Sequence, residues 1–292
     1  EHGPLPKLLR GLPMFHDPSY DMSSEPAVHV VDPWSAGRSS RTDVSNKNKG
    51  TAAFVGASGS GGIKGTANAE ADIHQIKIDS VAHPLTAPSP AELFITPVSE
   101  YGCRTCYAIK EYDELLDSCN MRCNDWARIA RDIVANYHAF DAFIVLHGTD
   151  TMAYSASALS FMLENLSKTV ILTGSQIPII RPRNDGVTNL LGALAIAGHF
   201  DIPEVTLFFG TRLIRGCRSS KVDSSSLELA FDSPNCVAPL ATVGIGIAIN
   251  WQEVRPPPVR PLRLHTKFTQ RITIMRIFPG VFATLENTLA PP

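Results

Sequence analysis

A regular pattern of hydrophobic and polar positions begins at about Ala91 and predicts a series of strands and helices. Apolar runs of the length expected for strands buried on both faces occupy residues 107–109, 142–146, 170–172 and 205–209. Apolar residues at helical spacing predict three helices, from Trp126 to Tyr137, from Met152 to Leu166 and from Leu190 to Ala197. Strand and helix therefore alternate along this part of the chain.

Polar residues near the ends of these stretches predict where the helices begin and stop. Asn124 or Asp125 is expected to cap the first helix, and Asn184 or Asp185 the third, which should close near Gly198. The alternation predicts an α/β fold with a doubly wound, mostly parallel sheet of Rossmann-like type. A further strand, expected from Ile272 to Ile277, would start a second, smaller α/β domain.

By composition the chain divides into four segments. Residues 1–22 are interpreted as an amino-terminal remnant of the main α/β domain, which itself covers residues 90–254. Between them, residues 23–89 are rich in Ser, Gly, Ala, Pro and Asn. They predict a flexible low-complexity insertion, because such a segment buries too little apolar surface to order itself. Residues 255–292 open with a proline-rich linker and are expected to start a truncated carboxy-terminal domain.

Length, composition and charge exclude several classes of protein. The 292 residues, 44% of them hydrophobic, are enough for a sizeable buried core. A net charge of −2, with 18% charged residues, argues against a nucleic-acid or membrane-surface partner. The sequence contains no apolar run of about 18 residues, and its first residues do not resemble a signal peptide. A cytoplasmic location is therefore expected.

The cysteines leave two interpretations open. Six cysteines in a chain of this length fit a reducing compartment, in which free thiols are the default. However, Cys103, Cys106, Cys119 and Cys123 follow a C-x2-C-x12-C-x3-C pattern, a spacing that suits a tetrahedral zinc site. The second pair falls where a helix is expected to begin, which favours free thiols.

Polar residues follow the predicted strands at their carboxyl ends, where ligands bind in doubly wound sheets. After Leu146, Gly148 allows a tight turn, Thr149 offers a hydroxyl and Asp150 a carboxylate. Lys221, which comes after the strand at 205–209, can reach over the sheet edge toward them. A hydroxyl beside a lysine and a carboxylate is a way to activate a nucleophile. Two plainer interpretations remain, in which Asp150 or Thr151 only caps a helix and Lys221 is a solvated surface charge.

Several motifs resemble the signatures of the asparaginase/glutaminase family, in particular its cytoplasmic type I members, which include the mammalian lysophospholipase-asparaginases. They occur in the family's order and are found at Leu12–Asp17, Leu116–Met121, Leu146–Met152, Ser160–Leu166 and Val170–Ile179. The resemblance covers about residues 8–20 and 103–292. It implies an amidohydrolase that splits L-asparagine into L-aspartate and ammonia with two threonines and neither a metal nor an organic cofactor. It also implies a homo-oligomer for the full-length protein.

The resemblance assigns roles to five residues. Thr149, Asp150 and Lys221 correspond to the family's second threonine and its aspartate and lysine partners. Asp117 and Ser118 would bind the α-amino and α-carboxylate groups of the substrate, together with Thr149 and Asp150. An acidic group near an ammonium and a hydroxyl near a carboxylate suit that task.

The sequence also departs from the family's pattern. The family's first threonine, which attacks the amide, lies in a Thr-Gly-Gly-Thr run upstream of the Leu12 motif, and this chain is expected to start after it. Ser60-Gly61-Gly62-Ile63 resembles that run but lies downstream of the motif. Most of the carboxy-terminal domain is expected to be missing as well, as in a fragment.

These departures keep other functions open. One is a catalytically inactive asparaginase fold that serves as a binding or assembly module. Another is a lysophospholipase or related acyl hydrolase, but the sequence has no Gly-x-Ser-x-Gly nucleophile elbow. The sequence does not decide between asparagine and glutamine as substrate.

Overall fold

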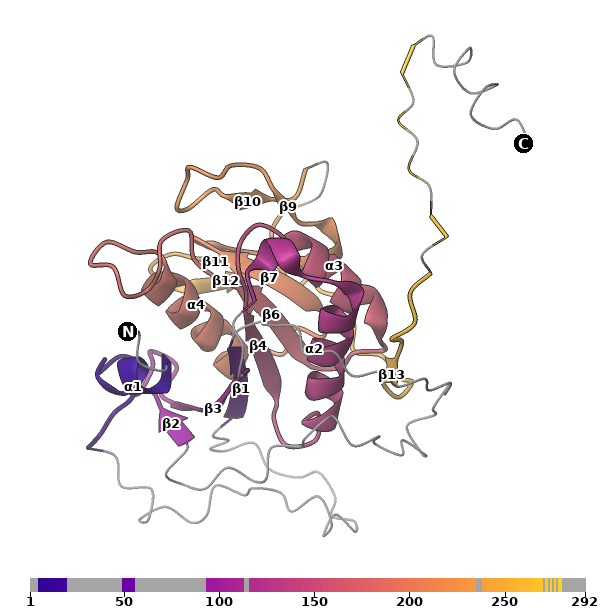
Figure 1. The fold of residues 1–292 in the computed structure, drawn as a ribbon. Coiled ribbons are helices and arrows are strands. Elements are labelled where there is room, and N and C mark those ends of the chain that lie inside the picture. The colour runs from indigo at the N-terminus through magenta and orange to yellow at the C-terminus, as the bar shows by residue number, and fades with distance from the viewer. Residues whose placement is uncertain are drawn as a thin grey trace.

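A nine-stranded sheet forms the centre of the computed structural model, which describes residues 5–19, 49–55, 93–112, 116–234 and 238–269, with single residues between 271 and 279. Its strand order is β12-β11-β8-β7-β6-β4-β1-β3-β2 (Figure 1). The strands are β1 (Lys49–Val55), β2 (Leu93–Ile95), β3 (Thr105–Glu111), β4 (Ala142–Leu146), β6 (Thr169–Thr173), β7 (Val205–Phe209), β8 (Arg212–Arg215), β11 (Ala241–Val243) and β12 (Ile247–Ile249).

The sheet is parallel at its centre and antiparallel at both edges. β3, β1, β4, β6 and β7 run parallel to one another. β8, β11 and β12 continue one side of the sheet in antiparallel order, and β2 pairs antiparallel with β3 on the other side. The predicted α/β class is thus confirmed. The sheet is mixed, because short antiparallel strands lie at both edges of its parallel centre.

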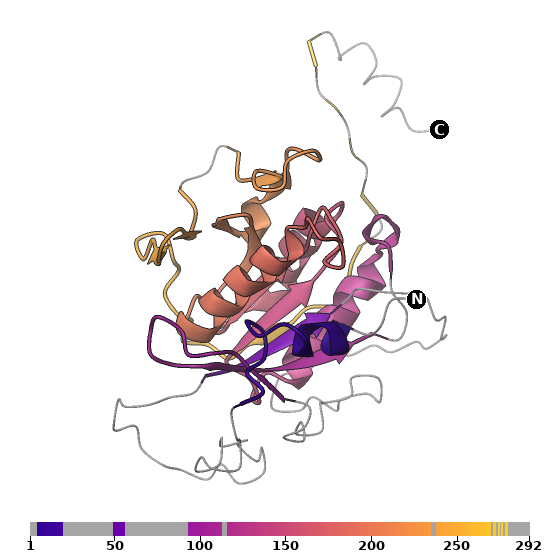
Figure 2. The same ribbon diagram turned by 90° about the vertical axis from the view of Figure 1, so that its left-hand side faces the viewer.

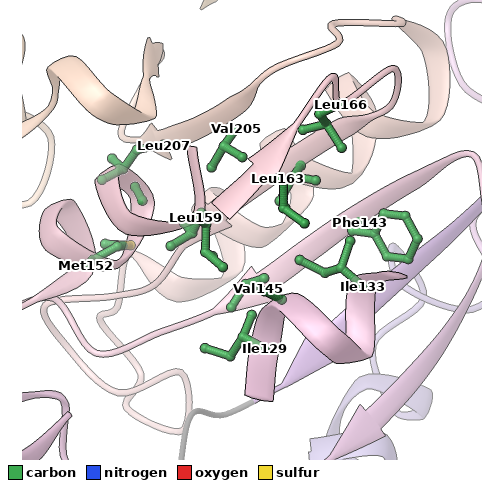
Figure 3. Packing of buried hydrophobic residues seen from close by; sticks show 14 of the residues in the cluster. Ile129, Ile133, Phe143, Val145, Met152, Leu159, Leu163, Leu166, Val205 and Leu207 are labelled. Atoms are coloured by element: carbon green, nitrogen blue, oxygen red, sulfur yellow. The ribbon is translucent and has the colours of Figure 1, made fainter. Parts of the chain in front are cut away.

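Helices cover both faces of the sheet. They are α1 (Leu5–Arg10), α2 (Cys123–Ala135), α3 (Met152–Met162) and α4 (Gly186–His199), with short 3₁₀ turns η3 (Ser118–Asn120) and η4 (Gly216–Arg218). The view turned by 90° shows helices on the two sides of the sheet (Figure 2). Phe143 and Val145 of β4 belong to the core formed with α2 and α3 (Figure 3), whereas Ile144 belongs to the core formed with α1 and α4. Burial on both faces explains why the sequence of β4 is apolar at every position.

Strand β1 corrects the prediction for residues 23–89. The sequence predicts a flexible insertion there, but residues 49–55 pair in parallel with both β3 and β4 in the middle of the sheet. Hydrogen bonding on two sides holds a segment whose own residues, largely small, give little strand signal. Residues 20–48 and 56–92 lie outside the described residues. So does Ser60, although it follows β1 in the chain.

The helix starts agree with the predicted caps. α2 begins at Cys123, and Asp125 lies inside the first turn, where its carboxylate accepts a hydrogen bond from the Arg122 N–H at 2.7 Å. α4 begins after Asp185, and the Asn184 side chain caps it by accepting the Val187 N–H at 3.1 Å. In each case one of the two predicted side chains makes the capping hydrogen bond.

One predicted element is wrong in extent, and another is only partly described. The second helix was expected to reach Leu166, but α3 ends at Met162, because Leu163 and Glu164 form strand β5 and pair with β13 (Arg263–Leu264). The residues described between 271 and 279 form no strand, and Ile272 and Ile274 are exposed there. The start of a second domain therefore stays a prediction.

Candidate active site

The carboxyl ends of the central strands meet at one edge of the sheet. In the register of the sheet, Leu146 of β4 lies between Val55 of β1 and Thr173 of β6. The carboxyl ends of these three strands therefore lie side by side. The loop from His147 to Thr151 leads from β4 into α3, and it carries two of the five site residues expected from the sequence, Thr149 and Asp150.

A lysine, a threonine and an aspartate are in direct contact at this edge. The Lys221 Nζ donates to Thr149 Oγ1 at 2.9 Å and to Asp150 Oδ1 at 2.8 Å. Lys221 belongs to β9 (Ser220–Lys221), which pairs with β10 (Phe231–Asp232). Its side chain is 18% exposed and that of Asp150 62% exposed, so the pair is open to solvent on the carboxylate side.

The hydroxyl of Thr149 has a second partner, Gln176, for which the sequence predicted no role. Its Oγ1 donates to Oε1 of Gln176 at 3.0 Å. Gln176 is held in place because its backbone N–H donates to Asp185 Oδ2 at 2.9 Å. With its proton directed to Gln176, Thr149 Oγ1 presents a lone pair to Lys221. Gln176 lies three residues after the end of β6, so its position close behind a strand was the signal available in the sequence.

The expected substrate-binding turn packs against the same loop. A Cβ atom on Gly148 would lie 2.6 Å from Ser118 Oγ, so only glycine permits this approach. Thr151 Oγ1 donates to the Ser118 carbonyl at 2.7 Å and ties the turn to the start of α3. Ser118 itself is buried. The turn and the loop thus form one continuous surface.

Asp117 adds a second carboxylate to this surface. It precedes η3, and its Oδ1 accepts the Cys119 N–H at 3.2 Å. A hydrogen bond to Asp117 and the charges of Asp117 and Asp150 raise the pKa of the Cys119 thiol. The carboxylates of Asp117 and Asp150 therefore both affect the exposed Cys119 thiol. The structure brings Thr149, Asp150 and Lys221 into contact, places Ser118 against their loop and leaves Asp117 at the exposed rim.

The cysteine pattern does not converge on a metal centre in the described part of the chain, which contains no group of three or more His, Cys, Asp or Glu side chains arranged for a metal ion. Cys106 lies in β3, where burial raises the pKa of its thiol to about 11. Cys119 and Cys123 are exposed free thiols. Among the described helices, none is long and apolar enough to cross a membrane.

Comparison with known proteins gives consistent matches. Residues 47–255 match the family model described as Asparaginase, N-terminal, a region that includes β1. L-asparaginase 1 of Escherichia coli K12 is 48% identical over 191 residues, which is 64% of this chain and 55% of that protein. The 60 kDa lysophospholipase of Homo sapiens is 45% identical over 202 residues, which is 69% of this chain and 35% of that protein.

The fold of the chain also matches that of a solved structure. The crystal structure of L-asparaginase I from Vibrio cholerae aligns with a TM-score of 0.62 and 40% sequence identity, covering 84% of this chain and 70% of that one. The chain spans about a third to just over half of the length of the curated relatives it matches.

Proposed function

The chain belongs to the asparaginase family, and on that premise we propose that it supplies the proton-transfer and substrate-binding groups of an enzyme that hydrolyses L-asparagine to L-aspartate and ammonia. The observation that carries the proposal is the contact of Lys221 with both Thr149 and Asp150. A structural module has no need of a lysine that bridges a hydroxyl and a carboxylate at the ligand-binding edge of the sheet.

In the proposed reaction, a hydroxyl oxygen attacks the side-chain amide carbon of asparagine. Thr149 Oγ1 takes the proton of that hydroxyl, and its own proton turns from Gln176 to the Lys221 amine. Lys221 then gives a proton to the departing nitrogen, which leaves as ammonia. Water then hydrolyses the ester and releases aspartate. Asp150 holds the Lys221 Nζ beside Thr149 through the ion pair at 2.8 Å.

The attacking hydroxyl is not assigned to a described residue. The family resemblance expects it after the first strand, and the carboxyl end of β1 lies beside Leu146, which directly precedes the loop that carries Thr149. Ser60 follows β1 in the sequence and remains a candidate on that ground alone.

Two carboxylates and a hydroxyl would bind the rest of the substrate. Asp150 and Asp117 are exposed and suit the α-ammonium group, and Ser118 suits the α-carboxylate. This division leaves the amide end of the substrate toward Thr149. The cytoplasmic location and the homo-oligomeric state expected from the sequence remain part of the proposal.

The test is ammonia release from L-asparagine by the purified protein and by its Thr149→Ala and Lys221→Met variants. We expect release by the parent protein to fall by a factor of at least roughly a hundred in both variants. Thr188→Ala, at an exposed position of α4, is the matched control and should retain full activity. If the parent protein binds asparagine without releasing ammonia, the inactive binding module is the better description. Hydrolysis of lysophospholipid instead would favour the acyl hydrolase.

A further inference from the structure

A chain of hydrogen bonds runs from helix α2 through helix α3 to the loop that carries Thr149. Trp126 Nε1 of α2 donates to Ser155 Oγ of α3 at 2.7 Å. Ser155 Oγ lies 2.8 Å from Nε2 of His147, and Nδ1 of His147 lies 2.6 Å from the carbonyl oxygen of Gly148. Ser155 and His147 are both buried, so water does not replace these contacts.

The groups at the two ends of this series of hydrogen bonds determine which atom donates in each bond. The Gly148 carbonyl can only accept, so His147 Nδ1 carries a proton. Burial lowers the pKa of His147, which keeps the imidazole neutral and leaves Nε2 without a proton. Nε2, at 2.8 Å, therefore accepts the Ser155 hydroxyl proton in preference to Met121 Sδ, a weak acceptor at 3.6 Å. The indole N–H of Trp126 can only donate, and it satisfies the Ser155 oxygen.

The backbone of His147 is held independently of its ring. Its N–H donates to the Thr173 carbonyl at 2.9 Å, which links the ends of β4 and β6. A Cβ on Gly174 would lie 2.1 Å from the His147 carbonyl oxygen, so the two segments are in close contact. The His147 imidazole thus extends from a fixed backbone toward the peptide group between Gly148 and Thr149.

Gly148 is the position in this loop that most needs such support. Glycine has no side chain to restrict its backbone, so the peptide group between Gly148 and Thr149 would otherwise rotate freely. A hydrogen bond to the Gly148 carbonyl fixes that peptide group. Because the peptide unit is planar, it also fixes the direction of the Thr149 N–H and the starting point of the Thr149 side chain.

We propose that His147 is a positioning residue, held by Ser155 and Trp126, that sets the Gly148–Thr149 peptide plane and so aims the Thr149 hydroxyl at Lys221. This role rests on the proposed function of Thr149. His147 does not touch the substrate or the reacting atoms; it acts through the backbone.

The first measurement is the tautomer of His147 by nitrogen NMR of the purified protein, which requires no turnover. We expect a protonated Nδ1 and an unprotonated Nε2 at neutral pH, with the resonance assigned by its loss in His147→Asn. Ser155→Ala should shift both the Nε2 signal and the amide signal of Thr149. An Nε2–H tautomer, or a Thr149 amide that Ser155→Ala leaves unchanged, would overturn the proposal.

The second measurement compares variants in asparagine hydrolysis. In His147→Asn the side-chain amide can donate near the Nδ1 position, whereas in His147→Gln it lies near Nε2. We expect His147→Asn to retain about tenfold more kcat than His147→Gln, with KM within about twofold. Equal kcat in the two variants would contradict positioning through Nδ1.

A milder substitution guards against loss of folding. Trp126→Phe keeps an aromatic ring in α2 but removes the donor, and we expect about a threefold lower kcat. Trp251→Phe, at an exposed tryptophan, is the matched control and should leave kcat unchanged. Unchanged kcat in Trp126→Phe would remove Trp126 from the proposal. If the parent protein releases no ammonia although the tautomer and the Thr149 amide respond as expected, the proposed function fails and the positioning of this peptide stands.

Discussion

The close contact between Gly148 and Ser118 predicts the effect of adding a single methyl group. A Cβ on residue 148 would lie 2.6 Å from Ser118 Oγ and 2.7 Å from Ser118 Cβ. Non-bonded heavy atoms normally approach to about 3.5–4.0 Å, so the atoms would have to separate by about 1 Å. Rotation of the Ser118 side chain would move Oγ but not Cβ, which means that the η3 turn itself must move.

The expected cost of Gly148→Ala follows from two opposing effects. Overpacking of a buried contact costs about 1–3 kcal/mol. Replacing glycine by alanine also restricts the unfolded chain, which returns about 0.4–1 kcal/mol. The net loss of unfolding free energy should be about 1–2 kcal/mol, and for a domain of this size Tm should fall by roughly 2–8 °C.

Urea unfolding of four proteins tests this reasoning: the parent, Gly148→Ala, Ser118→Gly and the double variant. Ser118→Gly removes both atoms in the way, so in its background Gly148→Ala should cost little, with a coupling free energy of about 1 kcal/mol or more. Gly246→Ala is the control, because a Cβ there meets no atom within 4 Å. A Gly148→Ala protein as stable as this control, or one whose loss is the same with and without Ser118, would refute the contact.

Three further predictions concern the site, the core and the response to pH. Gln176→Ala should lower kcat for ammonia release by about tenfold, because Thr149 loses its acceptor, while Gln252→Ala at an exposed turn should not. Phe143→Ala should lower the unfolding free energy by about 3–5 kcal/mol in urea titrations, whereas Phe161→Ala, 74% exposed, should change it by less than about 0.5 kcal/mol. Burial lowers the pKa of folded His147 below 6.5, so the unfolded chain binds its proton first as pH falls. Between pH 7 and 5 the parent should therefore lose stability more steeply than His147→Asn, by up to about 1.4 kcal/mol per pH unit, and equal slopes would contradict this.

The elements that the sequence predicts well are those whose own residues carry the signal. β4, β6 and β7 are apolar at nearly every position because both faces are buried, and the predicted bounds of β7 are confirmed. β1 was missed because its partners, not its side chains, define it: residues such as Gly50 and Ala52 would suit a linker equally well. The strands β2, β11 and β12 are only three residues long. They are too short to show the alternation of apolar and polar residues by which a strand is recognised.

The residues of the candidate site also include some that the sequence predicts and some that it does not. Thr149 and Asp150 follow β4 directly, so the position of the strand predicts where they lie. The sequence identifies Lys221 as a candidate residue but does not show where its side chain points. That direction depends on the pairing of Lys221 with Phe231 in a two-stranded sheet. The contacts of Gln176 with Thr149 and of Trp126 with Ser155 join residues 27 and 29 positions apart, and no local pattern encodes them.

The place of β1 in the sheet bears on how freely this chain can change in length. Each of its seven residues has a partner in β3, so one inserted or deleted residue within 49–55 would shift the register and exchange the two faces. A length change in a flexible connection is cheap by comparison, since doubling such a connection costs only about 0.6 kcal/mol in closure entropy. The seven positions of this central strand should therefore keep their spacing wherever the chain varies in length.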